Sequence, residues 1–535
     1  MRKSLTMNTN LPALPLGRST FSALRKSGAF FVDKTQLIFK LCSRPAKVFL
    51  ARPRRFGKSL LASTFLSLFK YGLRDFEGLE IESRWTDATY RVVLLDLSLV
   101  KDFSSVEDFR RQFIGQVAQS FHAAGYDGEA ELSSLQAWLL AQPARSLVLL
   151  IDEYDAPLTA CLDRPECLSA VQALLSEFFA GLKACERCFR FLFVTRITNL
   201  SNTGIFSDFG GLEDISTAPD FGALLGFTGR EIRESFAPYV TQAAELLNLS
   251  EDEVLCGLQK NYGGYCFDAR AQIKVLCPWS VLNFFNRPAR GFLNYWFQSG
   301  GGGTALVEHL GHHELAKPAA FAKAIKVPLE RLRPSGLDEA LTPDALLFQT
   351  GYLTIRSVSA ARTALLSYPN EEIVQSFARL YAYRLLKGRA CDALDAPGAQ
   401  PLALLLAVGT LDAIVQRFND LLEAIDHQHY PVTDAAACSV YLQVLMTGIE
   451  MVPGVKAHAL KGAHGLEVRA GHRHWVFEIK FVRKECEVEA ALAEGLQEAR
   501  GRELAATHAG KACVHTRAVL VFCAQTRAFA AWAQA

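Results

Sequence analysis

The first half of the chain alternates short apolar runs with stretches whose apolar residues recur at helical spacing. The apolar runs cover residues 47–51, 92–97, 147–151 and 191–195, and the helical stretches include residues 59–71 and 106–124. Alternation of this kind is typical of a parallel sheet that is covered by helices. The pattern therefore predicts an α/β domain at residues 10–225, with a parallel sheet and helices on both of its faces.

The pattern changes beyond this first domain. Strand signals become rare, and Leu- and Ala-rich helical stretches dominate residues 226–430, which we expect to form a mostly helical middle region. Short strands return at 474–481 and 518–522, on either side of a helical stretch at 488–506. This arrangement predicts a small α/β domain at residues 431–535.

The composition is that of a folded protein with more than one core. The chain has 535 residues, of which 50% are hydrophobic, 10% aromatic and 21% charged. This length exceeds that of a typical single domain, and the composition excludes disordered and collagen-like chains. The 57 Lys and Arg residues balance 55 Asp and Glu residues, which gives a net charge of +2. Nucleic acid binding would therefore need a local basic patch.

The sequence favours a cytoplasmic protein. The N-terminal residues lack a continuous apolar segment, and the longest apolar runs, at 147–151 and 402–408, are too short to span a bilayer. The 13 cysteines have no regular spacing, which argues against a disulfide framework. A reducing cytosol fits these features best.

A phosphate-binding signature follows the first apolar run. Gly57, Lys58 and Ser59 stand between the strand at 47–51 and the helical stretch that follows. In such a loop, backbone N–H groups surround the β-phosphate of a nucleotide, the Lys58 ammonium bridges phosphate oxygens, and the Ser59 hydroxyl ligates Mg²⁺. The first glycine of the usual G-x4-G-K-[ST] pattern is replaced by Arg52, so this signal alone is weak.

Two carboxylates supply the second half of such a site. The strand at 147–151 is followed directly by Asp152 and Glu153. We expect this strand to lie beside the phosphate loop, so that Asp152 holds Mg²⁺ and Glu153 orients the attacking water. The alternative is a buried strand that ends in two solvated carboxylates. The spacing of the two signals favours a nucleotide site.

The strand at 191–195 ends in polar residues that are candidates for sensing the γ-phosphate. Thr195 and Thr198 are the two candidates. An arginine that stabilises the transferred phosphate cannot be chosen from sequence, because Arg54, Arg55 and Arg196 are each suitable. The choice among these groups stays open.

The candidate site residues stand in long motifs, which are LPLGRSTFSALRKSGAFFVDKTQLIFKL, RPRRFGKSLLASTFLSLF, LIDEYDAPL and FVTRITNLSNTGIFSDFGGLEDIS. Further motifs are NYGGYCFD, CPWSVLNFF, YWFQSG and LLFQTGYLTI. Together these motifs resemble the bacterial AAA-ATPase-like family. In that family RPRRFGKS is the usual phosphate loop, so Arg52 follows the family pattern. The resemblance implies that ATP and Mg²⁺ are bound, and that Arg52, Arg54, Arg55, Phe56, Gly57, Lys58, Ser59, Leu60 and Thr195 contact the nucleotide. Arg196 departs from the family, which tends to have glycine there.

The middle motifs carry aromatic residues whose role the sequence leaves open. Tyr262, Tyr265 and Trp279 stand in the motifs NYGGYCFD and CPWSVLNFF. Aromatic side chains of this kind pack in a lid or a domain seam, or they contact a ligand directly. Packing is the reading that we favour.

Members of that family typically carry a C-terminal domain of the PD-(D/E)xK nuclease superfamily. The strand WVFEIKFV resembles its E-x-K motif, in which Glu478 would hold Mg²⁺ and Lys480 would position the attacking water. Residues two apart on a strand face the same side, so this pair projects together. Gly465 stands where the superfamily has a metal-binding aspartate. Glu467 or His464 is the candidate substitute. Related nucleases often have a glutamine on the helix after the E-x-K strand, and Gln497 is the candidate for it.

Three functions therefore stay open for the chain. The first is an ATPase that couples nucleotide state to a C-terminal nuclease-like domain. The second is a nucleotide-gated regulatory module that does not cut, and the third is an active ATP-regulated DNA nuclease that uses Glu467. From Met451 onward 12 Lys and Arg face 8 Asp and Glu, which makes DNA a candidate partner. An oligomer is a further candidate, because AAA-type sites often take an arginine from a neighbouring subunit.

Overall fold

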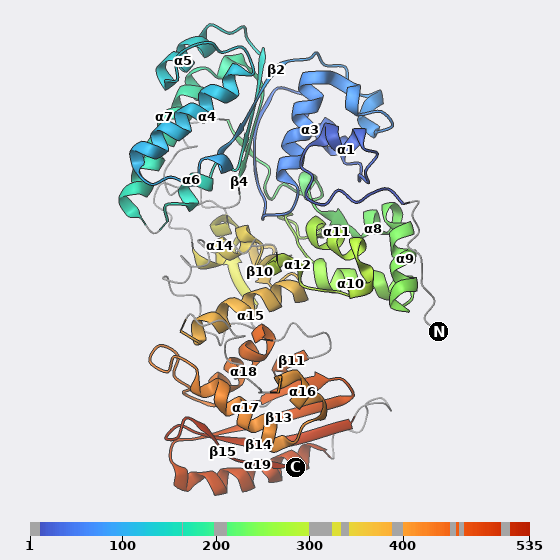
Figure 1. The fold of residues 1–535 in the computed structure, drawn as a ribbon, viewed down its shortest axis with the longest axis vertical. Helices are drawn as coiled ribbons and strands as arrows, with labels where there is room; N and C mark the ends of the chain where they lie inside the picture. The colour runs from blue at the N-terminus through green and yellow to red at the C-terminus, as the bar shows by residue number, and fades with distance from the viewer. Residues whose placement is uncertain are drawn as a thin grey trace. The chain divides into compact units, whose positions relative to one another are not determined.

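The chain forms two compact units in the computed structural model (Figure 1). The structure describes residues 11–162, 164–196, 211–298, 324–332, 342–387, 400–449, 456–459, 465–503 and 514–535. Unit 1 comprises Met1–His312 and Ile325–Glu371, and unit 2 comprises His313–Ala324 and Glu372–Ala535. The domain boundaries expected at residues 226 and 431 stay predictions.

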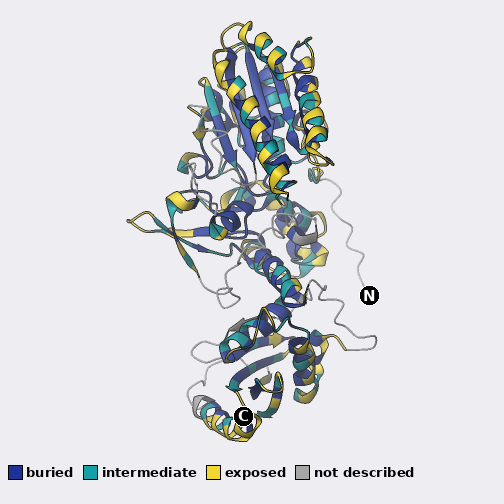
Figure 2. Ribbon diagram, turned by 90° about the vertical axis from the view of Figure 1, so that its left-hand side faces the viewer, coloured by how far each residue is buried: buried dark blue, intermediate teal, exposed yellow. Residues whose placement is uncertain are grey.

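Unit 1 is built on a five-stranded parallel sheet. Its strands are β1 (Ala46–Ala51), β2 (Arg91–Asp96), β3 (Leu147–Asp152), β4 (Phe189–Arg196) and β5 (Glu213–Asp214). They lie in the order β2-β3-β4-β1-β5 with parallel pairing throughout. Every residue of β3 and β4 is buried, as the dark blue strands of Figure 2 show. Strands that are covered on both faces read as continuous apolar runs, and the predicted parallel sheet is confirmed.

Helices cover both faces of this sheet. They are α1 (Phe21–Lys26), α2 (Thr35–Cys42), α3 (Lys58–Tyr71), α4 (Val106–His122), α5 (Leu132–Leu140), α6 (Ala156–Thr159) and α7 (Pro165–Ala184). In Figure 1, α4, α5 and α7 lie on one side of the sheet, and α1 and α3 lie on the other. The Phe65 ring of α3 packs against Phe191 and Phe193 of β4, with centroids 5.2 and 4.8 Å away. These contacts fix α3, and therefore the loop before it, against the sheet.

The strand order differs from the expectation in one respect. β3 was expected beside the phosphate loop, but β4 lies between β1 and β3. The chain leaves β1 toward β2 at one edge, and after β4 it continues to β5 on the other side of β1. Ligands of open parallel sheets bind where neighbouring connections leave in opposite directions. This point lies at the carboxyl ends of β1 and β4.

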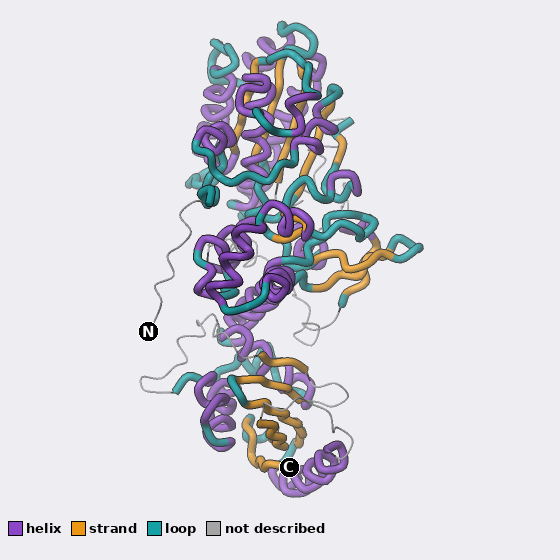
Figure 3. Tube along the Cα trace, turned by 90° about the vertical axis from the view of Figure 1, so that its right-hand side faces the viewer, coloured by secondary structure: helices purple, strands orange, loops and turns teal. Residues whose placement is uncertain are grey.

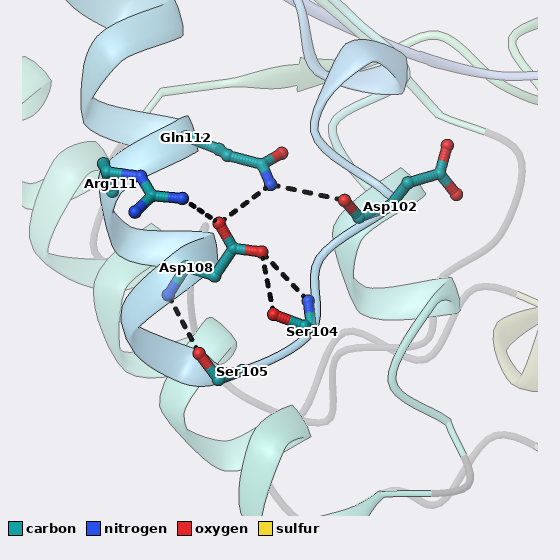
Figure 4. A network of polar contacts seen from close by, with 6 residues as sticks. All are labelled: Asp102, Ser104, Ser105, Asp108, Arg111 and Gln112. Atoms are coloured by element: carbon teal, nitrogen blue, oxygen red, sulfur yellow. Dashed lines mark hydrogen bonds and ion pairs between the residues drawn. The ribbon is translucent and has the colours of Figure 1, made fainter.

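A polar network fixes the connection from β2 to α4 (Figure 4). The Ser105 hydroxyl accepts a hydrogen bond from the Asp108 N–H at 3.1 Å, which caps the helix. The Asp108 carboxylate accepts from Ser104 N–H at 3.0 Å, from Arg111 at 2.6 Å and from Gln112 at 3.1 Å. The N–H of Ser104 is the largest of the influences that lower the pKa of Asp108. The loop at 97–105 is thereby held in place.

A helical module follows the sheet in unit 1. It contains β6 (Phe227–Thr228), α8 (Gly229–Ser235), α9 (Ala237–Leu247), α10 (Glu251–Tyr262), β7 (Val275–Leu276), α11 (Pro278–Asn286) and α12 (Tyr295–Gln298). Capping boxes at Thr228 and Ser250 begin α8 and α10. The module has its own apolar core, against which Leu16 and Phe30 of the N-terminal segment pack. The N-terminal segment thus joins the helical module.

The middle of the chain also contains a small antiparallel sheet, which the sequence analysis did not predict. Its strands are β8 (Ile325–Pro328), β9 (Thr354–Val358) and β10 (Thr363–Ser367), in the order β8-β10-β9, with α14 (Pro343–Thr350) before β9. Figure 3 shows it apart from the large sheet. Each strand is five residues or fewer, and alternation over so few positions is a weak signal.

Unit 2 contains a mixed five-stranded sheet and helices. They are α15 (Glu371–Leu385), α16 (Leu402–Val408), α17 (Leu411–Glu423), α18 (Ala435–Ile449), β11 (Lys456–Ala459), β12 (Gly465–Ala470), β13 (Arg473–Val482), α19 (Val488–Glu503), β14 (Val514–Cys523) and β15 (Ala528–Gln534). The strand order follows the sequence, and only the pair β13 and β14 is parallel among the described pairings. The strands and the helix expected near the C-terminus are present. The nuclease-like fold stays a prediction.

Helix α7 is a membrane-span candidate by length and composition, which the analysis of apolar runs did not single out. One such helix is weak evidence, because a core helix passes the same test. Its residues Val171, Leu175 and Phe179 are buried in the core of the large sheet. The helix therefore serves as a core helix of unit 1. Each cysteine that the structure describes is a free thiol, and a cytoplasmic location stays a prediction.

Candidate functional site

The phosphate loop joins β1 to α3 through a tight turn. Gly57 has φ +95° and Arg55 has φ +69°, both in the left-handed region. Glycine adopts this conformation without the steric cost that a side chain brings. Helix α3 then begins at Lys58, so its unpaired N–H groups lie at the end of the loop. A helix N-terminus in this place favours an anion.

Lys58 is buried and turns back into its own loop. Its ammonium donates to the carbonyl oxygens of Arg52 at 2.9 Å and Pro53 at 3.1 Å. Burial lowers the pKa of Lys58, whereas the nearby carboxylates, led by Glu153, act in the opposite direction. The cation is thus held at the centre of the loop.

Thr195 links the two carboxylates that follow β3. Its hydroxyl donates to Asp152 Oδ1, and it accepts from the N–H of Glu153 at 3.1 Å. Glu153 has φ +49°, and burial raises its pKa although Lys58 opposes the shift. Thr195 is fully buried, and it positions both carboxylates. Thr198, the other candidate sensor, lies outside the described residues.

The side chains of Arg52, a predicted nucleotide contact, and Arg196, one of the three candidates to stabilise the transferred phosphate, are hydrogen-bonded within the fold. The Arg52 guanidinium is buried, donates to Ser216 O and to Phe221 O at 3.3 Å, and lies 4.4 Å from the Phe267 ring centroid. Arg196 donates to the Tyr154 hydroxyl at 3.1 Å. Because both side chains pack inside the domain, their backbones rather than their guanidinium groups border the site.

Arg54 and Arg55 lie at the site itself, and both line the cavity described below. Arg54 is half-buried, and its charge influences the pKa values of Glu153 and Lys58. Arg55 stacks on Trp279, with its Cζ atom 4.3 Å from the ring centroid. The structure therefore distinguishes Arg54 and Arg55, which line the cavity, from Arg196, the third candidate that the sequence left open.

Aromatic residues from the middle motifs pack around the loop. Phe56 contacts Tyr265 and Phe267 edge to face, with centroids 4.9 and 5.1 Å away. Tyr262 and Tyr265 are fully buried, which fits the packing role. Gly351 lies so close to Pro53 that a Cβ there would stand 2.9 Å from the proline ring. The long motifs thus converge on the phosphate loop.

A cavity of about 580 Å³ opens beside the loop. Its lining includes Ser59, Leu60 and Glu153, together with Leu16, Val32, Lys34, Leu225, Trp279 and Leu282 from the N-terminal segment and the helical module. This volume suits a small organic ligand, and apolar walls with a few polar groups are typical of such sites. Sequence reasoning missed these walls. Leu16, Val32, Lys34, Trp279 and Leu282 stand in the motifs that carry the resemblance, whereas Leu225 lies outside them.

Lys34 fastens two walls of the cavity. Its ammonium donates to Ala223 O at 2.9 Å and pairs with Glu231 at 2.6 Å. Glu231 also closes the capping box that begins α8. Burial lowers the pKa of Lys34 although Glu231 opposes the shift. The N-terminal segment is therefore held against the helical module.

The donors near the loop fit Mg²⁺. Ser59 offers a hydroxyl at the cavity and Asp152 offers a buried carboxylate behind it. Hard oxygen ligands of this kind, completed by water and phosphate oxygens, are what Mg²⁺ prefers. Among the residues that the structure describes, no group of three or more His, Cys, Asp or Glu is placed to hold a metal ion. A site of this type thus depends on the nucleotide for further ligands.

The C-terminal candidates lie together on one face of β13, but their charges are paired. The Lys480 ammonium lies 2.9 Å from Glu498 and 3.9 Å from Glu494, both on α19. Glu478 is buried, and its carboxylate lies 3.8 Å from Arg517 Nε. Gln497 is exposed on the same helix. The helix thus covers the face that carries the predicted pair.

Gly465 pairs directly opposite Glu478 in the sheet. A Cβ at Gly465 would lie 2.1 Å from the Phe477 carbonyl oxygen, a separation that atoms do not adopt. The backbone therefore leaves no room for the aspartate of the superfamily pattern.

The Glu467 carboxylate is hydrogen-bonded to His474 on the same face of the sheet. Burial alone would raise the pKa of Glu467, but hydrogen bonding to His474 and the charge of Arg469 hold it below its usual value. The bond to His474 Nε2 is 2.7 Å, and His474 Nδ1 lies 2.7 Å from His515 Nδ1. His464 lies outside the described residues.

Comparison with known proteins places the N-terminal part in a family. Residues 15–206 match the AAA-ATPase-like family model, described as "Predicted AAA-ATPase". An uncharacterized protein in the vnfD 5′ region of Azotobacter chroococcum mcd 1 is 30% identical over 411 residues, which cover 73% of this chain and 76% of that protein. No solved structure matches the chain.

Proposed function

The chain belongs to the predicted AAA-ATPase family, and from this premise we propose that unit 1 binds ATP with Mg²⁺ and hydrolyses it. The observation that carries the proposal is the cavity of about 580 Å³, which has the phosphate loop on one side and apolar walls on the other. A nucleotide needs these two surfaces, because its phosphates are anionic and its base is largely apolar.

The loop residues bind the phosphates. The ammonium of Lys58 exchanges the carbonyl oxygens of Arg52 and Pro53 for phosphate oxygens, which are stronger acceptors. Backbone N–H groups at the start of α3 donate to the same anion. Ser59 and Asp152 hold Mg²⁺, which neutralises charge on the phosphate oxygens when bound. Arg54 adds a second cation at the cavity.

Glu153 activates the attacking water. Its raised pKa makes it a better base than an ordinary carboxylate. Glu153 accepts a proton from water, the oxygen of that water bonds to the γ-phosphorus, and the bond from phosphorus to the bridging oxygen of ADP breaks. Thr195 holds the backbone of Glu153 during this step.

For unit 2 we propose a binding module that does not cut nucleic acid and whose access is gated by the nucleotide state of unit 1, with DNA as the candidate partner. The close contact at Gly465 favours this role, because it removes the place of one metal ligand. The alternative of an active nuclease requires Glu467 as that ligand. DNA cleavage that is lost in Glu467→Ala supports the alternative, and its absence in the wild type supports the binding module.

Calorimetric titration of ATP in the presence of Mg²⁺ tests the proposal for unit 1. The wild type binds ATP, and Lys58→Ala loses most of the affinity. Lys70→Ala is the matched control, since this exposed lysine stands at the other end of the same helix. Equal ATP affinity of wild type and Lys58→Ala contradicts the proposed site.

A further inference from the structure

At the cavity, the guanidinium of Arg55 stacks on the indole ring of Trp279. The Cζ atom of Arg55 lies 4.3 Å from the centroid of the indole ring. Both side chains are half-buried and both line the cavity. A cation over the face of a tryptophan is attracted by the ring quadrupole, and tryptophan is the best partner for this contact.

The two partners come from different parts of unit 1. Arg55 belongs to the phosphate loop and has a left-handed backbone. Trp279 is the second residue of α11, and its indole N–H donates to Tyr295 O at 3.3 Å. Trp279 also packs against the apolar core of the helical module. The position of the ring is therefore set by the helices and not by the sheet.

Stacking restrains the guanidinium in a way that suits phosphate. The flat face of the group meets the ring, whereas its N–H donors lie in the plane of the group and point outward. This planar fork matches two phosphate oxygens at once. A guanidinium that is already oriented loses less conformational freedom when the anion binds.

We propose that Trp279 is a positioning residue that holds Arg55 toward the phosphates of a bound nucleotide, so that phosphate binding depends on where helix α11 lies. This inference rests on the proposed function of unit 1. It makes Trp279 a contact of Arg55 and not a stacking platform for the base.

Nucleotides with different numbers of phosphates separate these roles. Titration calorimetry measures the Kd of ATP and of AMP, with Mg²⁺, for the wild type, Trp279→Phe, Trp279→Leu, Arg55→Ala and the double variant Arg55→Ala/Trp279→Leu. Loss of one such contact costs on the order of 10-fold in affinity. We expect that loss for ATP in Trp279→Leu, about 2-fold or less for AMP, and partial retention in Trp279→Phe. The double variant matches Arg55→Ala alone, because the residues act as one unit.

The chain offers a matched control in a second pair of this kind. Arg91 lies 5.7 Å from the ring centroid of Trp138, which does not line the cavity. Trp138→Leu should leave both Kd values unchanged. Should Trp279→Leu fail to fold by circular dichroism, Arg55→Ala and Trp279→Phe carry the test through the same ATP-selective loss.

The outcomes distinguish the inference from the function on which it rests. A wild type that does not bind ATP overturns the proposed function and the inference with it. A wild type that binds ATP beside a Trp279→Leu variant of equal affinity overturns the inference alone. Equal weakening of ATP and AMP binding assigns Trp279 to the base and overturns the inference. Additive losses in the double variant also overturn the inference, because they show that Trp279 acts independently of Arg55.

Discussion

Each unit brings a lysine and a carboxylate together, but the surroundings of the two pairs differ. In unit 1, Lys58 and Glu153 lie at a cavity of about 580 Å³. In unit 2, Lys480 pairs with Glu498 at 2.9 Å and Glu478 lies 3.8 Å from Arg517. A lysine with a carboxylate is therefore a site only where the surrounding backbone leaves room for a ligand.

Two glycines show the physical origin of this difference. Gly57 is required by its φ of +95°, and the nearest described atom to a Cβ there is Leu225 Cδ2 at 3.9 Å. Gly465 is required by a close contact, because a Cβ there would lie 2.1 Å from a carbonyl oxygen. The first glycine shapes a turn and keeps space open, whereas the second lets two strands close the space.

The largest expected effect is on hydrolysis in unit 1. Lys58→Ala removes the buried cation, and Glu153→Gln removes the base, so each should lower the turnover of ATP by about 100-fold or more. Phosphate release at saturating ATP measures this effect. Lys70→Ala should keep wild-type turnover, and near-normal rates in Glu153→Gln would show that another group acts as the base.

The next effect concerns the closed site of unit 2. Gly465→Asp places an aspartate where the superfamily sequence pattern has one, but the fold leaves no room for its side chain. The substitution should therefore lower the free energy of unfolding of unit 2 by about 2 kcal/mol, and it should not produce DNA cleavage. Urea unfolding and a DNA cleavage assay measure the two outcomes. Gly471→Asn is the control, since no described atom lies within 4 Å of a Cβ there and asparagine tolerates its φ of +58°. A stable Gly465→Asp variant that cuts DNA would show that the backbone of unit 2 does leave room for a metal ligand.

The pH dependence of kcat/KM sharpens the account of unit 1. Glu153 must be ionised to act as a base, and burial raises its pKa above the ordinary 4.5, so activity should rise with pH through that higher value. Lys58 must be protonated, and burial lowers its pKa below the ordinary 10.5, so activity should fall on the alkaline side earlier than for a solvated lysine. Both pKa shifts narrow the pH range over which the protein hydrolyses ATP. An acid limb that persists unchanged in the residual activity of Glu153→Gln would assign it to another group.

The smallest effect is expected at Lys480. Lys480→Met breaks a pair whose side chains are 24% and 39% exposed. Pairs of this exposure contribute about 1 kcal/mol or less, so thermal unfolding of unit 2 should change little and ATP turnover should be unchanged. A large loss of stability would show that the lysine does more than pair with α19.

The sequence predicted the elements of the large sheet well but not their order. The runs LVLLI (147–151) and FLFV (191–194) are apolar throughout because β3 and β4 are buried on both faces. Which strand stands next to β1 depends on packing between distant segments, and so the insertion of β4 was missed. The site residues Lys58 and Glu153 came from spacing along the chain. The cavity walls could not be predicted in this way, because Leu16 and Leu225 are ordinary apolar residues that only the fold brings together.

The C-terminal site shows the opposite limit. The i, i+2 spacing of Glu478 and Lys480 correctly places both on one face of β13, since the alternation of side chains is a property of any strand. The partners of these charges, Arg517 and Glu498, lie on other elements and carry no local signal. Gly465, in the place of the superfamily's aspartate, was the sequence feature indicating that the metal-binding pattern lacks one ligand.

Phosphate release from ATP, measured with linear DNA and Mg²⁺ in the same tubes, tests the contrast between the two units most directly. The account predicts turnover in the wild type, loss of turnover in Lys58→Ala and Glu153→Gln, and intact DNA in every tube. Absence of turnover in a wild type that is folded, or DNA cleavage that disappears in Glu478→Gln, would contradict it.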